Sequence, residues 1–190
     1  MHHIMIESKT FKGIDFAEVE FETIEYDDCT FDNCSFSGVD IAGTTFLECE
    51  FVDCNLSMSR VENVSFKDVR FHNCKMLGLN FNDCNSFLLD LHFSHCQLKL
   101  SSFASLNLKG IVFQDCQLEE VDFSLTNLSA AEFANCDLKR AIFERSNLEK
   151  ADFRSAIQYA IDPENNRLKN ARFSLSGVVG LLEKYQIKIQ

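Results

Sequence analysis

Large apolar residues recur every five positions through most of the chain. In the first half they fall at Phe11, Phe16, Phe21, Tyr26, Phe31, Phe36, Ile41, Phe46, Phe51, Leu56, Val61, Phe66, Phe71, Met76 and Phe81. In the second half they fall at Leu88, Phe93, Leu98, Phe103, Leu108, Phe113, Leu118, Phe123, Leu128, Phe133, Leu138, Phe143, Leu148 and Phe153. A period of five fits neither the 3.6 residues of an α-helix nor the two of a strand. It predicts a chain that turns a corner after each pentapeptide.

Four pentapeptides close a square coil of 20 residues, and successive coils should stack about 4.8 Å apart, as neighbouring strands do. The step of 20 places like residues above one another. One side reads Phe11, Phe31, Phe51, Phe71, Phe93, Phe113, Phe133 and Phe153. This column keeps its identity only if two extra residues are absorbed before Leu88. We therefore expect a bulge near residues 84–88, around Asn85-Ser86-Phe87.

Individual repeats, such as Ala151-Asp152-Phe153 and Cys136-Asp137-Leu138, match the motif A(D/N)LXX. Over roughly residues 6–157 the chain resembles the pentapeptide repeat family. That resemblance implies an all-β fold, a right-handed quadrilateral β-helix, which agrees with the square coil inferred from the period.

The regular pattern ends near Gln158, and the segment that follows contains the only proline, Pro163. We expect one domain over residues 1–190. Residues 1–160 form the β-helix, and residues 161–190 form a closing loop, a last partial repeat at Ala171-Arg172-Phe173, a helix and a tail. The helix is expected to be a short amphipathic α-helix, capped by Ser174 or Ser176, because apolar residues at i, i+3, i+4 and i+7 mark one helical face. Those residues are Leu175, Val178, Val179 and Leu182, and the tail 185–189 alternates like a short strand.

An open solenoid end exposes apolar side chains and unpaired backbone groups, so a helix should cover it. An apolar face left over would pair with its mate across a two-fold axis. The sequence therefore predicts a homodimer joined through its C-terminus. A simple cap on a monomer is the alternative.

The nine cysteines carry no zinc-site spacing. Each stands two positions before a core position, so we expect small buried thiols. His92, His95 and Cys96 could be metal ligands by residue type. We expect that they cannot meet at one ion, because the repeat points both histidines outward and Cys96 inward. We see no signal peptide and no membrane-spanning run, and we expect a cytoplasmic protein with reduced cysteines. With no catalytic motif, we expect no enzyme, no cofactor and no metal.

The net charge of −11 argues against direct binding to nucleic acid. Residues 1–86 carry 16 acidic and 6 basic residues, whereas residues 87–190 carry 13 and 12. Seven carboxylates should face solvent on two adjoining sides: Glu20, Glu22, Glu25, Asp27, Asp28, Asp40 and Glu48. This acidic face either serves as a solvated surface or mimics a nucleic acid.

The C-terminal part most resembles the microcin-immunity and quinolone-resistance branch of the family, whose members are dimeric rods that act on DNA gyrase and topoisomerase IV. The matching features are the Asp162-Pro163-Glu164 loop and an apolar tail over 180–189. The resistance members carry long projecting loops, and this chain has only the bulge, which leaves gyrase binding or microcin-type immunity more open than drug protection. The leading hypothesis is a non-enzymatic DNA mimic that occupies the DNA site of a type II topoisomerase. The rival is a generic protein-interaction scaffold whose partner is unrelated to DNA.

Overall fold

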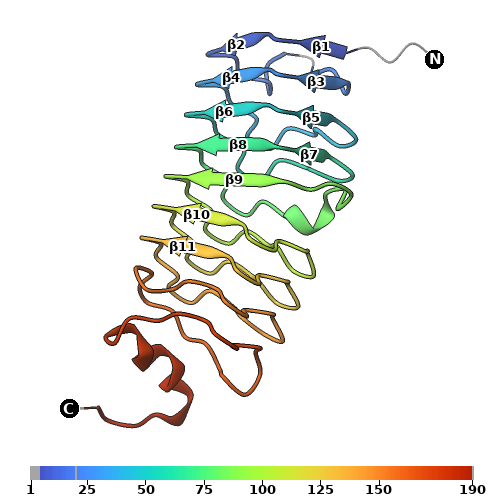
Figure 1. Ribbon diagram of the computed structural model, residues 1–190. Coiled ribbons are helices and arrows are strands. Elements are labelled where there is room, and N and C mark those ends of the chain that lie inside the picture. Colours follow the sequence, from blue (N-terminus) through green and yellow to red (C-terminus); the bar gives the residue numbers. More distant parts are fainter. Residues whose placement is uncertain (1–4, 20, 190) are drawn as a thin grey trace.

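The computed structural model describes residues 5–19 and 21–189. They form a parallel β-solenoid whose coils stack one on the next, from β1 at the top of Figure 1 to the C-terminus at the bottom. The quadrilateral β-helix expected from the sequence is confirmed. Its strands are short: β1 Met5–Glu7, β2 Thr10–Lys12, β3 Glu25–Asp27, β4 Thr30–Asp32, β5 Thr45–Leu47, β6 Glu50–Val52, β7 Ser65–Lys67, β8 Val69–His72, β9 Leu91–Ser94, β10 Val112–Gln114 and β11 Glu132–Ala134. No helix of the described residues is long and apolar enough to cross a membrane.

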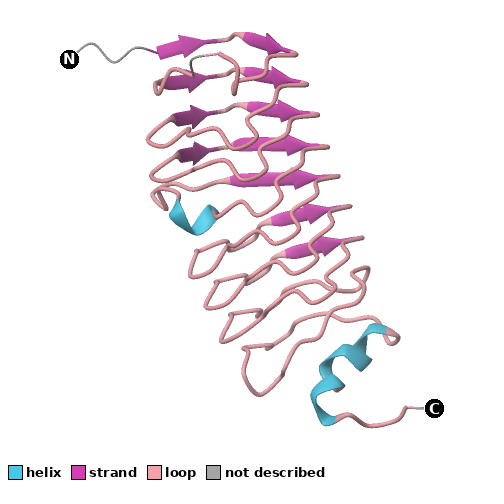
Figure 2. Ribbon diagram, turned by 180° about the vertical axis from the view of Figure 1, so that it is seen from behind, coloured by secondary structure: helices cyan, strands magenta, loops and turns pink. Residues whose placement is uncertain are grey.

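Two walls of the coil are parallel sheets, with strand orders β1-β3-β5-β7 and β2-β4-β6-β8-β9-β10-β11. The other two walls are held by single bridges between coils, such as Ser35 with Asn55 and Asp40 with Arg60. Figure 2 shows the strands of these two sheets stacked side by side, with loops along the other walls. The register step is 20 residues, since Phe31 pairs with Phe51. Each outward side chain therefore has a counterpart directly above it.

The interior is a pile of aromatic and aliphatic side chains. In the phenylalanine column, consecutive rings stack nearly parallel, with centroids 4.8 Å apart for Phe31 and Phe51 and 5.4 Å apart for Phe113 and Phe133. Rings of the opposite wall meet them edge-on, so aromatic pairs adopt both favoured geometries. Phe31, Phe51, Phe71, Phe93, Phe113, Phe133 and Phe153 are buried, while Phe11 is partly exposed at the N-terminal end of the pile. Phe173 continues the column, 5.3 Å from Phe153.

The corners use left-handed backbone at a regular spacing, as at Asp28, Asn33, Gly38 and Gly43. Few of these positions are glycine: Met58, Leu100, Arg140 and Lys150, among others, also have φ near +60°. Such a conformation costs an ordinary residue roughly 1–2 kcal/mol. The backbone N–H of the left-handed residue donates to a carbonyl of the next coil, for example from Asp28 to Leu47 at 2.9 Å. This repeated bond explains how the coil turns its corners with only seven glycines in the chain.

All nine cysteines are buried and reduced. The thiols of seven of them, Cys84 and Cys116 apart, contact a backbone carbonyl of the preceding coil, as Cys54 does toward Phe31 at 3.2 Å. Hydroxyls at equivalent positions donate to the same kind of carbonyl: Ser59 to Phe36 at 2.7 Å and Thr126 to Phe103 at 2.9 Å. At these coils, the position two residues before a core residue therefore holds a small side chain that can satisfy a buried carbonyl.

The bulge lies where the sequence places it. Phe71 pairs with Phe93, a step of 22, and a 3₁₀ turn, η1 (Phe81–Asp83), precedes the irregular segment. The expectation that Leu88 joins the core is wrong. Leu88 is 63 % exposed with φ +58°, and Leu89 packs against the core instead. The extra residues shift the side-chain direction within the wall, so the five-residue count fails for that one coil.

The C-terminal segment forms 3₁₀ turns rather than the expected α-helix. They are η2 (Gly177–Leu181) and η3 (Glu183–Tyr185), and the tail beyond them is not a strand. Gly177 and Gly180 press against Tyr159, where a Cβ at either position would collide with it. Two glycines also weaken an α-helix of this length. The segment therefore caps the solenoid by close backbone contact.

Phe113→Asp should unfold the protein. It places a carboxylate among fully buried rings, and the several kcal/mol needed to bury an unpaired charge is a large part of a typical domain's stability. Phe113→Leu, which keeps the site apolar, should fold with a loss of about 1–2 kcal/mol. Urea unfolding followed by circular dichroism measures both. A folded Phe113→Asp variant with near wild-type stability would contradict the stacked core.

The thiols should be inert in the folded protein. Burial raises the pKa of the Cys49 thiol to about 12, so the reactive thiolate is scarce at neutral pH. A thiol-specific chromogenic reagent at pH 8 should label no cysteine of the native protein and all nine after denaturation. Rapid labelling of one or more thiols before unfolding would argue against their burial.

Candidate functional site

A column of carboxylates runs along the corner between the two sheets. Asp28, Glu48 and Asp68 share the same left-handed corner position, with φ +51° at each. The register of β3 with β5 and of β5 with β7 sets them one coil apart. Asp90 follows Asp68 because Val69 pairs with Leu91. We call these four residues the carboxylate column.

The remaining acidic residues expected at the surface lie around this column. Glu22 is exposed, and Glu25 and Asp27 flank the buried Tyr26 on β3 with their side chains half-buried. Asp40 lies on another wall, where Arg60 approaches it at 3.4 Å. Glu20 lies outside the described residues. The structure thus places Glu25 and Asp27 on β3 and Asp28 and Glu48 in the corner that follows the β1-β3-β5-β7 sheet, and it leaves Asp40 apart from them.

Charge pairing differs between the two halves of the rod. Within the described residues, no Lys or Arg lies within 4.0 Å of the carboxylates of Glu22, Glu25, Asp27, Asp28 or Glu48. Further along the chain, Glu119 contacts Lys99 at 3.0 Å and Arg140 at 2.7 Å. These cations lower the pKa of Glu119 to about 2, Lys99 first among them. Among the described residues, these five carboxylates therefore lack a cationic partner. Asp32, Asp40, Glu62 and Asp68 of the same half are paired with Lys or Arg, as are Glu119, Glu120, Glu149 and Asp152 of the C-terminal half.

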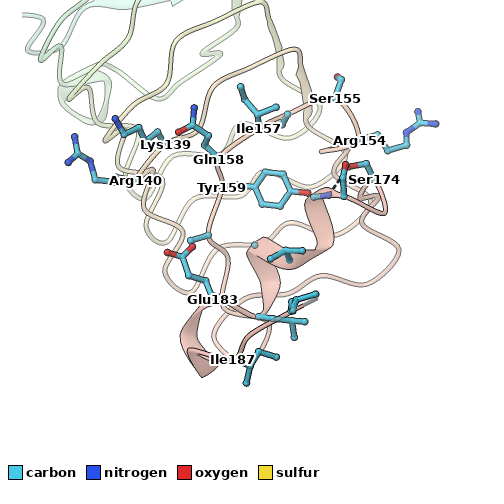
Figure 3. Close-up of a pocket in the computed structure, with 18 of the residues that line it drawn as sticks. Lys139, Arg140, Arg154, Ser155, Ile157, Gln158, Tyr159, Ser174, Glu183 and Ile187 are labelled. Atoms are coloured by element: carbon cyan, nitrogen blue, oxygen red, sulfur yellow. Dashed lines mark hydrogen bonds between the residues drawn. The ribbon is translucent and has the colours of Figure 1, made fainter.

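The C-terminal end carries exposed apolar side chains and a hollow of about 1040 Å³ (Figure 3). Leu175 is 91 % exposed and Val179 45 %, while Val178 is also exposed and Leu182 half-buried. Lys184 Nζ, 2.6 Å from Asp162, and the Tyr185 hydroxyl, 2.8 Å from Glu164, tie this segment to the 161–166 loop. The end is thus a fixed surface, with its apolar residues held outward.

The sequence analysis missed Asp68 and Asp90 as members of the column. The signal was present, because Asp28, Glu48 and Asp68 are 20 residues apart and Asp90 follows after a step of 22. A second feature it missed is a shallow groove of about 550 Å³ on the seven-stranded sheet. Glu50, Arg70, His72, His92 and Val112 are among its lining residues.

The arrangement suits binding rather than covalent chemistry. The cysteines, which are the strongest nucleophiles of the chain, lie inside the coil, and the exposed walls are flat strands and corners. A row of negative charges at a fixed spacing, held by backbone hydrogen bonds, needs no rearrangement to meet a row of positive charges.

Comparison with known proteins gives the family. Residues 24–87 and 84–153 match a family model described as the pentapeptide repeat region. No curated protein matches the chain. Among solved structures, HetL, a pentapeptide repeat protein involved in heterocyst differentiation regulation from the cyanobacterium Nostoc sp. strain PCC 7120, has a TM-score of 0.58. It is 13 % identical over 92 % of this chain and 88 % of its own.

Full-length QnrB1, a plasmid-mediated fluoroquinolone resistance protein, has a TM-score of 0.48 and 20 % identity. The match covers 96 % of this chain and all of QnrB1. At 13 % identity, the similarity to HetL establishes a common fold and nothing about the partner of this chain. The family model, together with the five-residue repeat and the stacked square coils, shows that this chain belongs to the pentapeptide repeat family.

Proposed function

We propose that this protein is a non-enzymatic DNA mimic that binds a type II topoisomerase, gyrase or topoisomerase IV, by occupying its DNA site. The carboxylate column carries the proposal. One charge per coil, at about 4.8 Å per coil, amounts to about 0.2 charges per Å, against about 0.3 per Å for one strand of DNA. A protein groove built to hold a phosphate backbone would attract such a column.

The distribution of ion pairs supports the same proposal. Unpaired carboxylates at the N-terminal half can exchange water and counterions for the lysines and arginines of a DNA-binding groove. The carboxylates of the C-terminal half, such as Glu119 and Asp152, already have cationic neighbours in this chain. The N-terminal half should therefore enter the groove first. Such binding would serve resistance or immunity toward agents that poison gyrase.

A second candidate function is a scaffold for a protein unrelated to DNA. It is favoured by apolar side chains exposed on successive coils at another corner: Met58 at 67 %, Leu77 at 43 % and Leu100 at 50 %. Contacts to that corner would be insensitive to salt, whereas contacts to the carboxylate column would weaken steeply with it.

Charge reversal tests the proposed role of the column. The double variant Asp28→Lys with Glu48→Lys should weaken binding to gyrase or topoisomerase IV at least about tenfold at low salt, because like charges then face each other. Folding should persist, since Lys150 and Arg140 occupy left-handed corner positions in this chain. Surface plasmon resonance over a salt series measures the affinity.

The matched control is Glu132→Lys with Glu144→Lys, which makes the same change in net charge on the C-terminal half, where both side chains are exposed. It should change the affinity by less than about threefold. Equal loss in both double variants, or no wild-type binding to either enzyme at low salt, would rule out the proposal.

We further propose that two copies join through the apolar C-terminal end formed by Leu175, Val178, Val179 and Leu182. Light scattering after gel filtration should give about twice the chain mass of 21.7 kDa. Leu175→Glu with Val179→Glu should halve that mass and leave the circular dichroism spectrum unchanged, because a charge cannot be buried across the interface. Leu100→Glu, at an exposed site far from this end, should stay dimeric. A wild-type mass of one chain would favour the capped monomer.

A further inference from the structure

One cluster of metal-ligand side chains lies where the bulge meets the seven-stranded sheet. His92 Nε2 is 3.6 Å from Asp68 Oδ1 and 3.4 Å from Asp90 Oδ1. One ligand atom from each of the three residues falls within 4.8 Å of the other two. Four ligands at about 2.0–2.1 Å around a tetrahedral ion lie about 3.4 Å from one another. The two distances from the imidazole nitrogen are therefore close to those of a coordination shell.

The bulge creates this cluster. With the regular step of 20, Leu88 would follow Asp68 at this corner. The step of 22 between β8 and β9 puts Asp90 beside Asp68 instead, and it pairs Arg70 with His92. Among residues 5–19 and 21–189, the cluster therefore appears at a single coil, at the position where the repeat is interrupted.

One carboxylate oxygen of the cluster, Asp68 Oδ1, is shielded from solvent and is contacted by a charged side chain. This oxygen accepts no hydrogen bond, and the Asp68 side chain as a whole is 41 % exposed. Arg70 Nη2 approaches it at 2.9 Å as an ion pair, without the geometry of a hydrogen bond. Two aspartates on adjacent coils repel each other, and one arginine offsets only one of them.

We propose that Asp68, Asp90 and His92 bind a divalent transition-metal ion of the Zn²⁺ class. An imidazole nitrogen with two carboxylate oxygens suits Zn²⁺, whereas Ca²⁺ takes six to eight oxygens and Mg²⁺ favours an octahedron of oxygens. Water completes the shell, because the shallow groove lined by Arg70 and His92 opens beside the cluster. Arg70 must leave Asp68 for the ion to bind.

This proposal differs from the sequence expectation of no metal. The sequence offered His92 with His95 and Cys96, and these do not converge. Cys96 is buried, and the imidazole of His95 lies 3.9 Å from Asp115 on the next coil. The actual partners of His92 lie 24 and two residues before it in the chain, a combination that no linear motif contains. The site shares Asp68 and Asp90 with the carboxylate column, and its test does not require topoisomerase binding.

Titration of the full-length protein with Co²⁺, followed by visible absorption, tests the site, and calorimetry with Zn²⁺ gives the affinity. We expect one ion per chain. Asp90→Asn and His92→Ala should each weaken binding by about tenfold or more. Arg70→Gln should strengthen it, because it removes a competing positive charge. A merely structural role for these residues would not produce opposite effects in the same assay.

Two control variants exclude other ligands. His95→Ala removes a nearby imidazole outside the cluster, and His2→Ala with His3→Ala removes the imidazoles at the N-terminal end of the sequence. Both should bind like the wild type. Absence of wild-type binding at millimolar Co²⁺ and Zn²⁺, or equal affinity in all five variants, would overturn the proposal.

Discussion

The stacking of one coil on the next, at the spacing of neighbouring parallel strands, is the constraint on which the rest of this structure depends. It sets equivalent backbone atoms above one another, so each side chain contacts the side chain at the same position of the next coil, and in the phenylalanine column the two are alike. Inside, flat rings satisfy this condition well, since Phe93 and Phe113 stack within 6° of parallel. Outside, the same condition turns single residues into columns. Surface residues that are 20 positions apart in the sequence therefore lie next to each other on successive coils.

Much of the fold could be predicted because the period of five has few structural solutions. The four walls, the phenylalanine column, the position of the bulge and the inward thiols all follow from counting. The direction of the Leu88 side chain could not be predicted, because the five-residue repeat does not say which residues point inward where its spacing changes. The C-terminal cap was also out of reach. Its apolar residues show helical spacing, but the contact of Gly177 and Gly180 with Tyr159 is tertiary and favours 3₁₀ turns.

The candidate site was predictable in kind and only partly in membership. A run of acidic residues without Lys or Arg is visible in the sequence, and it lies in the half of the molecule where the carboxylate column forms. Which carboxylates line up depends on the walls they occupy. Asp40 lies with Arg60 on a different wall from Asp28, and Asp90 enters the column only through the two additional residues of the bulge. The bulge thus shapes the surface charge more than it disturbs the core.

If the acidic half of the rod occupies the DNA site of gyrase, the protein and duplex DNA should compete for that site. Competition measures this most directly. A labelled duplex is bound to gyrase at low salt, and its fluorescence anisotropy is followed as the protein is added. We expect the anisotropy to fall to the value of free DNA. The protein concentration at half displacement should rise as the concentration of labelled duplex is raised. Unchanged anisotropy, with the protein bound alongside the DNA, would contradict occupation of the DNA site.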